Sequence, residues 1–152
     1  MDSTDINNIQ WLVAENVTKQ NDDEQGVEQP SPVAGARAWK DSKGRYHRIG
    51  GPAFISSDGS QQWIVHGKTH REDGPALIYD DGSIWYLNGQ RHRINGPAVQ
   101  LKNGEQHWYI KGNRYSNINA WAKAALEFEG KDTNNANIQD KIQQVMQQDL
   151  FS

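Results

Sequence analysis

The chain has 152 residues, a formal net charge of −3 and no cysteine. That length suffices for one folded domain with its own hydrophobic core, and the lack of cysteine excludes disulfides, thiol chemistry and thiolate metal ligands. The longest apolar runs, residues 11–14 and 84–87, are too short to cross a bilayer, and the N-terminus is acidic where a signal peptide is basic. We therefore expect a cytoplasmic protein that is neither secreted nor inserted into a membrane.

The charge is unevenly distributed along the chain. Residues 1–38 carry seven acidic and two basic side chains, residues 39–116 carry seven and eleven, and residues 117–152 carry five and three. The mildly basic centre suits an acidic partner surface, but it falls well short of the basic footprint of a nucleic-acid-binding protein. We therefore expect no nucleic-acid partner.

The N-terminal quarter of the chain divides into two segments. Residues 1–18 carry apolar side chains at the three-and-four spacing of a helix, with Ser3 or Thr4 available as the cap. These apolar side chains are Ile6, Ile9, Val13 and Val17. Residues 19–38 are polar, acidic and small, a composition that buries too little apolar surface to order itself. The pattern predicts an N-terminal helix followed by a flexible acidic linker.

Residues 39–115 form an internal repeat with a period of 22 to 23 residues. Three copies share the motif His-Arg-x-x-Gly-Pro-Ala, which begins at His47, His70 and His92. Each motif is followed by a short strand candidate, an Asp-Gly or Asn-Gly pair and a tryptophan, and a second glycine turn precedes each His-Arg pair. Asp-Gly and Asn-Gly pairs between short β-rich runs are strong hairpin signals. The repeat predicts a single twisted antiparallel β-meander.

Residues 116–152 are predicted to form helices. A helix over residues 118–129 follows from an apolar stripe, with Ser116 or Asn117 as its N-cap and Gly130 as its stop. The stripe consists of Ile118, Trp121, Ala122, Ala125 and Phe128. A second apolar pattern, embedded in glutamines, consists of Ile138, Ile142, Val145, Met146 and Leu150. These helices either cap the end of the repeat array or dock on another chain as a homo-oligomer, and we favour the cap. The predicted fold class is α+β, mostly β with flanking helices.

The repeat resembles the MORN family of β-hairpin repeats, and its His-Arg-x-x-Gly-Pro-Ala form looks like a variant found in bacterial and bacteriophage proteins. The resemblance covers residues 39–115. It implies a scaffolding or protein-binding role, and in some members binding to anionic lipid. Arg48, Arg71 and Arg93 stand where the common MORN unit has a second glycine, so lipid binding is not carried over.

The repeated histidines and arginines each allow two interpretations. Equivalent residues of successive copies lie about 9–10 Å apart in a meander, too far for the three histidines to share a metal ion, so we expect hydrogen bonds that order the turn into Gly-Pro. The arginines either form a ladder that grips carboxylates or phosphates, or each stacks on an aromatic ring and binds turn carbonyls. We favour the second interpretation and expect neither metal nor cofactor.

The sequence contains no nucleophile elbow, phosphate-binding loop or metal-binding helix motif, so we expect a non-enzymatic protein-binding module. Tyrosine and arginine are enriched in binding hot spots. The candidate partner-binding residues of these types are Arg48, Arg71, Arg93, Tyr79, Tyr86 and Tyr109. The resemblance implies a phage-encoded inhibitor or modulator of a host defence protein, acting in the host cytoplasm. The alternative is a binder of a small anionic ligand, such as a nucleotide, glycan or lipid headgroup, on the basic repeat sheet.

Overall fold

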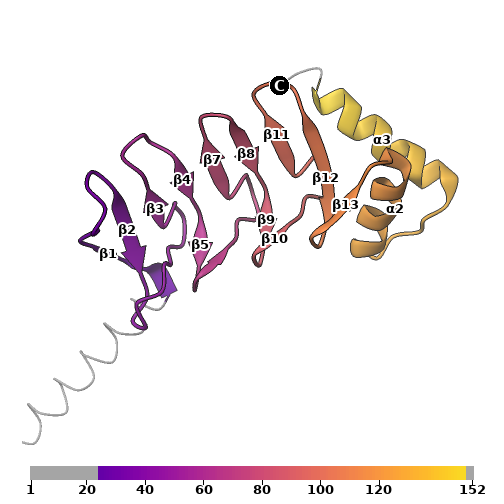
Figure 1. Ribbon diagram of the computed structural model, residues 1–152. Coiled ribbons are helices and arrows are strands. Elements are labelled where there is room, and N and C mark those ends of the chain that lie inside the picture. The colour runs from indigo at the N-terminus through magenta and orange to yellow at the C-terminus, as the bar shows by residue number, and fades with distance from the viewer. Residues whose placement is uncertain (1–23, 150–152) are drawn as a thin grey trace, which may run out of the picture. The chain divides into compact units, whose positions relative to one another are not determined.

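The computed structural model describes residues 24–149, which belong to two compact units that divide after Lys68. Short antiparallel strands joined by tight turns make up most of this part of the chain, and two helices follow them (Figure 1). The predicted α+β class, an antiparallel meander with C-terminal helices, is confirmed. No helix in the described range is long and apolar enough to cross a membrane. The helix predicted over residues 1–18 lies outside the described residues.

The strands of the first unit follow one another in space as they do in sequence. In this order they are β1 (Val27–Gln29), β2 (Arg37–Lys40), β3 (Phe54–Ile55) and β4 (Gln61–Gln62). A short two-stranded ladder follows, made of β5 (Ile64–Val65) and β6 (Lys68–Thr69). Residues 56–60 form a short hairpin turn between β3 and β4, whereas residues 41–53, which include the first motif, separate β2 from β3.

Strand β1 and the start of β2 lie within residues 19–38, the stretch predicted as a flexible linker. The two strands pair antiparallel, with Glu28 opposite Trp39. The Glu28 carboxylate accepts hydrogen bonds from Nε and Nη2 of Arg37 over 2.8 and 3.1 Å, and Ala38 and Trp39 are buried. The linker prediction was therefore wrong for these strands, because the polar strand β1 gains order from pairing with a strand that is itself anchored in the core.

The second unit repeats this arrangement and adds the helices. Its strands, in spatial order, are β7 (Leu77–Tyr79), β8 (Gly82–Ile84), β11 (Val99–Leu101), β12 (Gln106–Ile110) and β13 (Asn113–Tyr115). A separate short hairpin consists of β9 (Tyr86–Leu87) and β10 (Gln90–Arg91). The turn between β9 and β10 has positive φ at both central residues, 49° at Asn88 and 81° at Gly89. These values are those of the type I′ turn that suits a two-residue hairpin.

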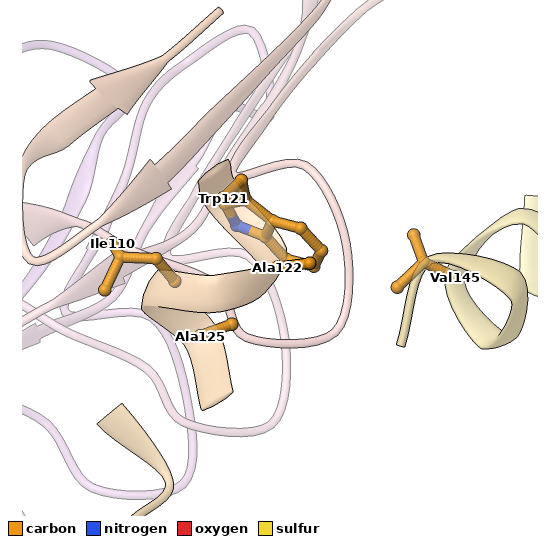
Figure 2. Close-up of a cluster of buried hydrophobic side chains, with 5 residues drawn as sticks. All are labelled: Ile110, Trp121, Ala122, Ala125 and Val145. Carbon is orange, nitrogen blue, oxygen red and sulfur yellow. The ribbon is translucent and has the colours of Figure 1, made fainter. Parts of the chain in front are cut away.

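Helices α2 (Ile118–Phe128) and α3 (Asn135–Asp149) pack at the end of the second unit, α2 against β12 and β13 and α3 against α2 (Figure 1). The predicted N-cap is confirmed, because the Asn117 side chain accepts a hydrogen bond from the backbone N–H of Asn119 over 2.8 Å. The core between them consists of Ile110, Trp121, Ala122, Ala125 and Val145 (Figure 2). The apolar faces of both helices are thus used within the chain, as a cap requires.

An ion pair fastens α3 to the end of α2. Nζ of Lys141, a buried side chain, lies 2.7 Å from Oε1 of Glu129. Burial opposes ionisation of Glu129, but its contacts with Lys131 and Lys141 outweigh this effect and lower the pKa of the carboxyl group. The pair therefore stabilises the fold above the ordinary carboxyl pKa, and this contribution is lost as the pH falls through the lowered value.

Replacing Trp121 tests the role of this core. The side chain is fully buried, its ring lies 4.6 Å from that of Trp108, and its Nε1 donates to the carbonyl oxygen of Arg93 over 3.3 Å. We expect Trp121→Ala to lower the free energy of unfolding by about 3–5 kcal/mol in urea denaturation. The exposed Lys123 on the same helix is the control, since Lys123→Ala should change it by no more than about 0.5 kcal/mol. A similarly small loss for Trp121→Ala would show that the helices are not docked on the strands.

Candidate functional site

Each motif histidine holds the turn of the next hairpin. The Nδ1 atoms of His47, His70 and His92 accept hydrogen bonds from the backbone N–H groups of His66, Asn88 and Lys111 over 2.9, 3.0 and 2.9 Å. Because an amide nitrogen can only donate, Nδ1 is unprotonated in all three rings, and neutral imidazole then carries its proton on Nε2. The predicted hydrogen-bonding role is confirmed, but the bond orders the following hairpin turn instead of the Gly-Pro turn.

The motif arginines bind carbonyl oxygens of their own copy. Nη1 of Arg48, Arg71 and Arg93 donates to the carbonyl oxygens of Pro52, Pro75 and Pro97 over 3.2, 3.1 and 3.2 Å. The guanidinium carbon of Arg48 lies 3.9 Å from the ring centroid of Trp39, and that of Arg93 lies 4.1 Å from that of Trp85. These contacts agree with the stacking interpretation favoured from the sequence, in which the arginines serve the fold.

The glycine and alanine of the motif leave room for these contacts. A Cβ atom built on Gly51, Gly74 or Gly96 would lie 2.8, 2.7 or 2.8 Å from the guanidinium carbon of the arginine three residues earlier. Ala53, Ala76 and Ala98 have no exposed surface. The conserved spacing of the three copies therefore describes an internal framework, in which each motif residue contacts another part of the same fold.

Asp41 is the centre of a cluster of hydrogen bonds in the first unit. Its buried carboxylate accepts hydrogen bonds from the backbone N–H groups of Lys43 and Arg45, from Nε of Arg45 over 2.8 Å and from Nδ1 of His66 over 2.9 Å. Burial opposes ionisation, but the hydrogen bonds from His66, Arg45 and Lys43 outweigh it and lower the pKa of the carboxyl group. The sequence analysis did not select Asp41. Its signal was the turn over residues 42–44, which is one residue longer than the equivalent turns His66-Gly67 and Asn88-Gly89.

The Asp41–His66 pair has the geometry that orients an imidazole as a general base. The ring of His66 also stacks on that of His47, with centroids 3.9 Å apart. Asp41 is, however, shared with Arg45, and the pocket described below is lined by other residues. We therefore interpret the cluster as the anchor of its turn.

The second unit contains a pocket of about 390 Å³ between two copies of the repeat and helix α2. It is lined by Arg71, Glu72, Trp85, Leu87, His92, Arg93, Ile94, Asn95 and Phe128. Phe128, the last residue of α2, is 40% exposed, and its ring lies 4.5 Å from that of His92. Nζ of Lys111 lies 5.2 Å from the centroid of the Phe128 ring. A mostly apolar hollow of this size, with a few charged groups, is typical of a binding site.

The structure brings only some of the predicted partner-binding residues to this pocket. Arg71 and Arg93 line it, whereas Arg48 belongs to the first unit. Tyr79, Tyr86 and Tyr109 are not among the lining residues and instead form one apolar cluster. Tyr109 is buried there, and its hydroxyl oxygen accepts a hydrogen bond from Nη1 of Arg91 over 3.2 Å.

The sequence analysis missed the apolar lining of the pocket, namely Leu87, Ile94 and Phe128. Phe128 shares its helical stripe with the buried Trp121 and Ala125, so periodicity alone assigns it to the core. Leu87 stands where two other copies have Val65 and Ile110, and Ile94 differs from Glu72 but matches Ile49, so variation between the copies gave little signal for these two residues.

Over residues 24–149, the structure contains no group of three or more histidine, cysteine, aspartate or glutamate side chains that could hold a metal ion. Comparisons with protein-family models, with curated proteins and with solved structures found no match. The pocket is therefore the candidate site on geometry alone.

A double-mutant cycle tests the fit between glycine and arginine in the motif. Gly96→Ala should lower the free energy of unfolding by about 1–3 kcal/mol, because the added methyl group displaces the Arg93 guanidinium from its place beside Trp85. In an Arg93→Ala background the same change should cost clearly less, since the clash is gone. Urea denaturation of the four proteins measures both values. Purely additive losses would contradict the proposed fit.

Proposed function

We propose that the chain is a non-enzymatic protein-binding module that takes an apolar side chain of its partner into the pocket of the second unit. The observation that carries the proposal is the exposed ring of Phe128 in a hollow that Trp85, Leu87 and Ile94 also line. Apolar and aromatic side chains gathered at one concave site are typical of the anchor positions of protein interfaces. The arginines at the same pocket suit its polar rim.

The pattern of variation between the copies supports this position. The motif residues contact one another, so a partner is expected to read the positions that differ. The two residues after each motif arginine are Ile49 and Gly50, Glu72 and Asp73, and Ile94 and Asn95. Glu72, Ile94 and Asn95 line the pocket, so this surface belongs to these two copies in particular.

The specific form that the MORN-like resemblance implies is a phage-encoded inhibitor or modulator of a host defence protein. Its partner would then be a bacterial protein in the host cytoplasm. Self-association through the C-terminal helices has less support, because Ile138, Ile142 and Val145 of α3 pack on the core beneath α2. A mass measurement in solution separates this form from a heterologous complex.

A small anionic ligand in the same pocket is the second candidate. Its volume lies in the range of small-molecule sites, and Arg71 and Arg93 are among its lining residues. Thermal-shift screening against nucleotides, glycans and lipid headgroups tests this form, because a ligand at 100 times its dissociation constant adds about 2.7 kcal/mol to folding stability. No shift across the panel would exclude it.

Replacing Phe128 with aspartate tests the protein-binding form. We expect the wild-type chain to retain a stoichiometric protein from bacterial lysate, and Phe128→Asp to lose it, because a carboxylate replaces the apolar wall of the pocket. Met146 on α3 offers a matched control, since it is 44% exposed and does not line the pocket. Met146→Asp should retain the same protein.

The fold of both variants is checked by urea denaturation before the pull-down. Recovery of the partner by Phe128→Asp would exclude the pocket as its site. Failure of the wild-type chain to recover any stoichiometric protein would contradict the proposed function itself.

A further inference from the structure

We propose that the turn held by His92 forms a proton-sensitive latch, in which protonation of His92 in mild acid releases the Lys111 amide and its turn. The consequence at His92 is a change in the wall of the pocket, so that its binding is weakened below the histidine titration range. The latch itself is independent of the proposed function, whereas its effect on binding rests on it.

The latch depends on the chemistry of the hydrogen-bond acceptor, the Nδ1 atom of the histidine. Nδ1 of neutral imidazole has one lone pair, and in each copy that lone pair accepts the backbone N–H of a turn residue. Protonated imidazole has two N–H donors and no acceptor. At Lys111, for example, two N–H groups would then point at each other, and the amide would lose its partner.

The hydrogen bonds to the histidines also hold the turn residues in an uncommon backbone conformation. The three turn residues that donate are not glycine, yet they have positive φ values of 46° at His66, 49° at Asn88 and 49° at Lys111. This left-handed conformation is uncommon for residues with a side chain and persists where surrounding contacts impose it. Loss of the histidine acceptor therefore removes a hydrogen bond that holds the turn residue in its left-handed conformation.

The surroundings of His92 oppose its protonation. Burial and the nearby Lys111 ammonium both lower the pKa of the ring. The Phe128 ring beside it carries no charge, and the charged residues that line the same pocket are Arg71, Glu72 and Arg93. In the unfolded chain the ring takes up its proton near pH 6.5, the unshifted value. The neutral ring therefore stabilises the fold above about pH 6.5, and this contribution falls as the pH drops from there toward the lowered folded value.

The other two histidines face different groups. Nε2 of His70 lies 3.6 Å from the exposed carboxylate of Glu72. The ring of His47 stacks on the ring of His66, and His66 is hydrogen-bonded to Asp41. Nε2 of His47 donates to the carbonyl oxygen of Glu24 over 3.1 Å. His92 is thus the copy in which a positive charge, Lys111, faces the ring, and it is also the copy that lines the pocket.

The test uses amide hydrogen exchange, measured by NMR on the whole chain at about pH 7.5 and about pH 5.5, on either side of the unshifted histidine pKa of about 6.5. In the wild-type chain we expect the protection factor of the Lys111 amide to fall at the lower pH. The backbone N–H of Trp121 donates a hydrogen bond to the carbonyl oxygen of Asn117 within helix α2, and this amide should stay protected at both pH values. Its protection distinguishes local release of the turn from unfolding of the whole chain. Equal protection of Lys111 at both pH values would overturn the proposal, as would simultaneous loss at Trp121.

Two variants of His92 sharpen the result. The amide oxygen of asparagine can accept in place of Nδ1 but does not titrate, so His92→Asn should keep the Lys111 amide protected at both pH values. His92→Ala lacks an acceptor and should leave that amide unprotected at both. If the His92 variants fail to fold, the wild-type comparison of the Lys111 and Trp121 amides at the two pH values still decides the proposal. If the Lys111 amide of His92→Asn lost as much protection at the lower pH as that of the wild type, the latch would be contradicted.

Binding provides a separate readout. Once a partner is recovered, its affinity for the wild-type chain should fall between about pH 7.5 and about pH 5.5, and that for His92→Asn should fall less. If no partner exists, the exchange result on the chain alone still decides whether the latch is real. An affinity that falls equally for both proteins would overturn the link between the latch and the pocket.

Discussion

One hydrogen bond organises each copy of the repeat, the bond from a turn amide to Nδ1 of a motif histidine. It connects a motif to the turn of the next hairpin, about 19 residues along the chain, and its length is nearly the same in all three copies. The adjacent arginine binds the carbonyl oxygen of the motif proline, and the glycine before that proline leaves space for the guanidinium group. Histidine, arginine and glycine are therefore needed together, which explains why they recur as one motif.

Because the motif residues contact one another, the proposed recognition of a partner is assigned to the residues that vary between the copies. In the second unit the varied positions Glu72, Ile94 and Asn95 meet Phe128, the last residue of α2, around one pocket. The apolar stripe of α2 therefore has two roles. Trp121 and Ala125 are buried in the core, while Phe128 stays partly exposed. In the proposed function the binding site would be carried on the repeat scaffold, an arrangement that is common among repeat proteins.

The turns and the helix cap could be predicted from the sequence, because they are decided by interactions between residues close together in the chain. A turn was predicted before each His-Arg pair, as at Asn88-Gly89, and Ser116 or Asn117 was predicted to start the helix, because each signal acts within a few residues. Strand β1 was missed because its order comes from pairing with β2, which composition does not reveal. The pocket was missed because it forms only when the third motif meets Phe128, more than 30 residues later in the chain. Arg71 and Arg93 were selected as candidates and do line it, although their recurrence reflects the scaffold.

The most direct test of this account is NMR detection of scalar coupling across the histidine hydrogen bonds. The account predicts correlations from the amide nitrogens of the three turn residues to the Nδ1 atoms of the motif histidines at neutral pH. The expected pairs are His66 with His47, Asn88 with His70, and Lys111 with His92. Nitrogen chemical shifts should also show Nδ1 unprotonated and Nε2 protonated. Absence of these correlations, with protonated Nδ1 atoms in folded protein, would contradict the central role assigned to the motif.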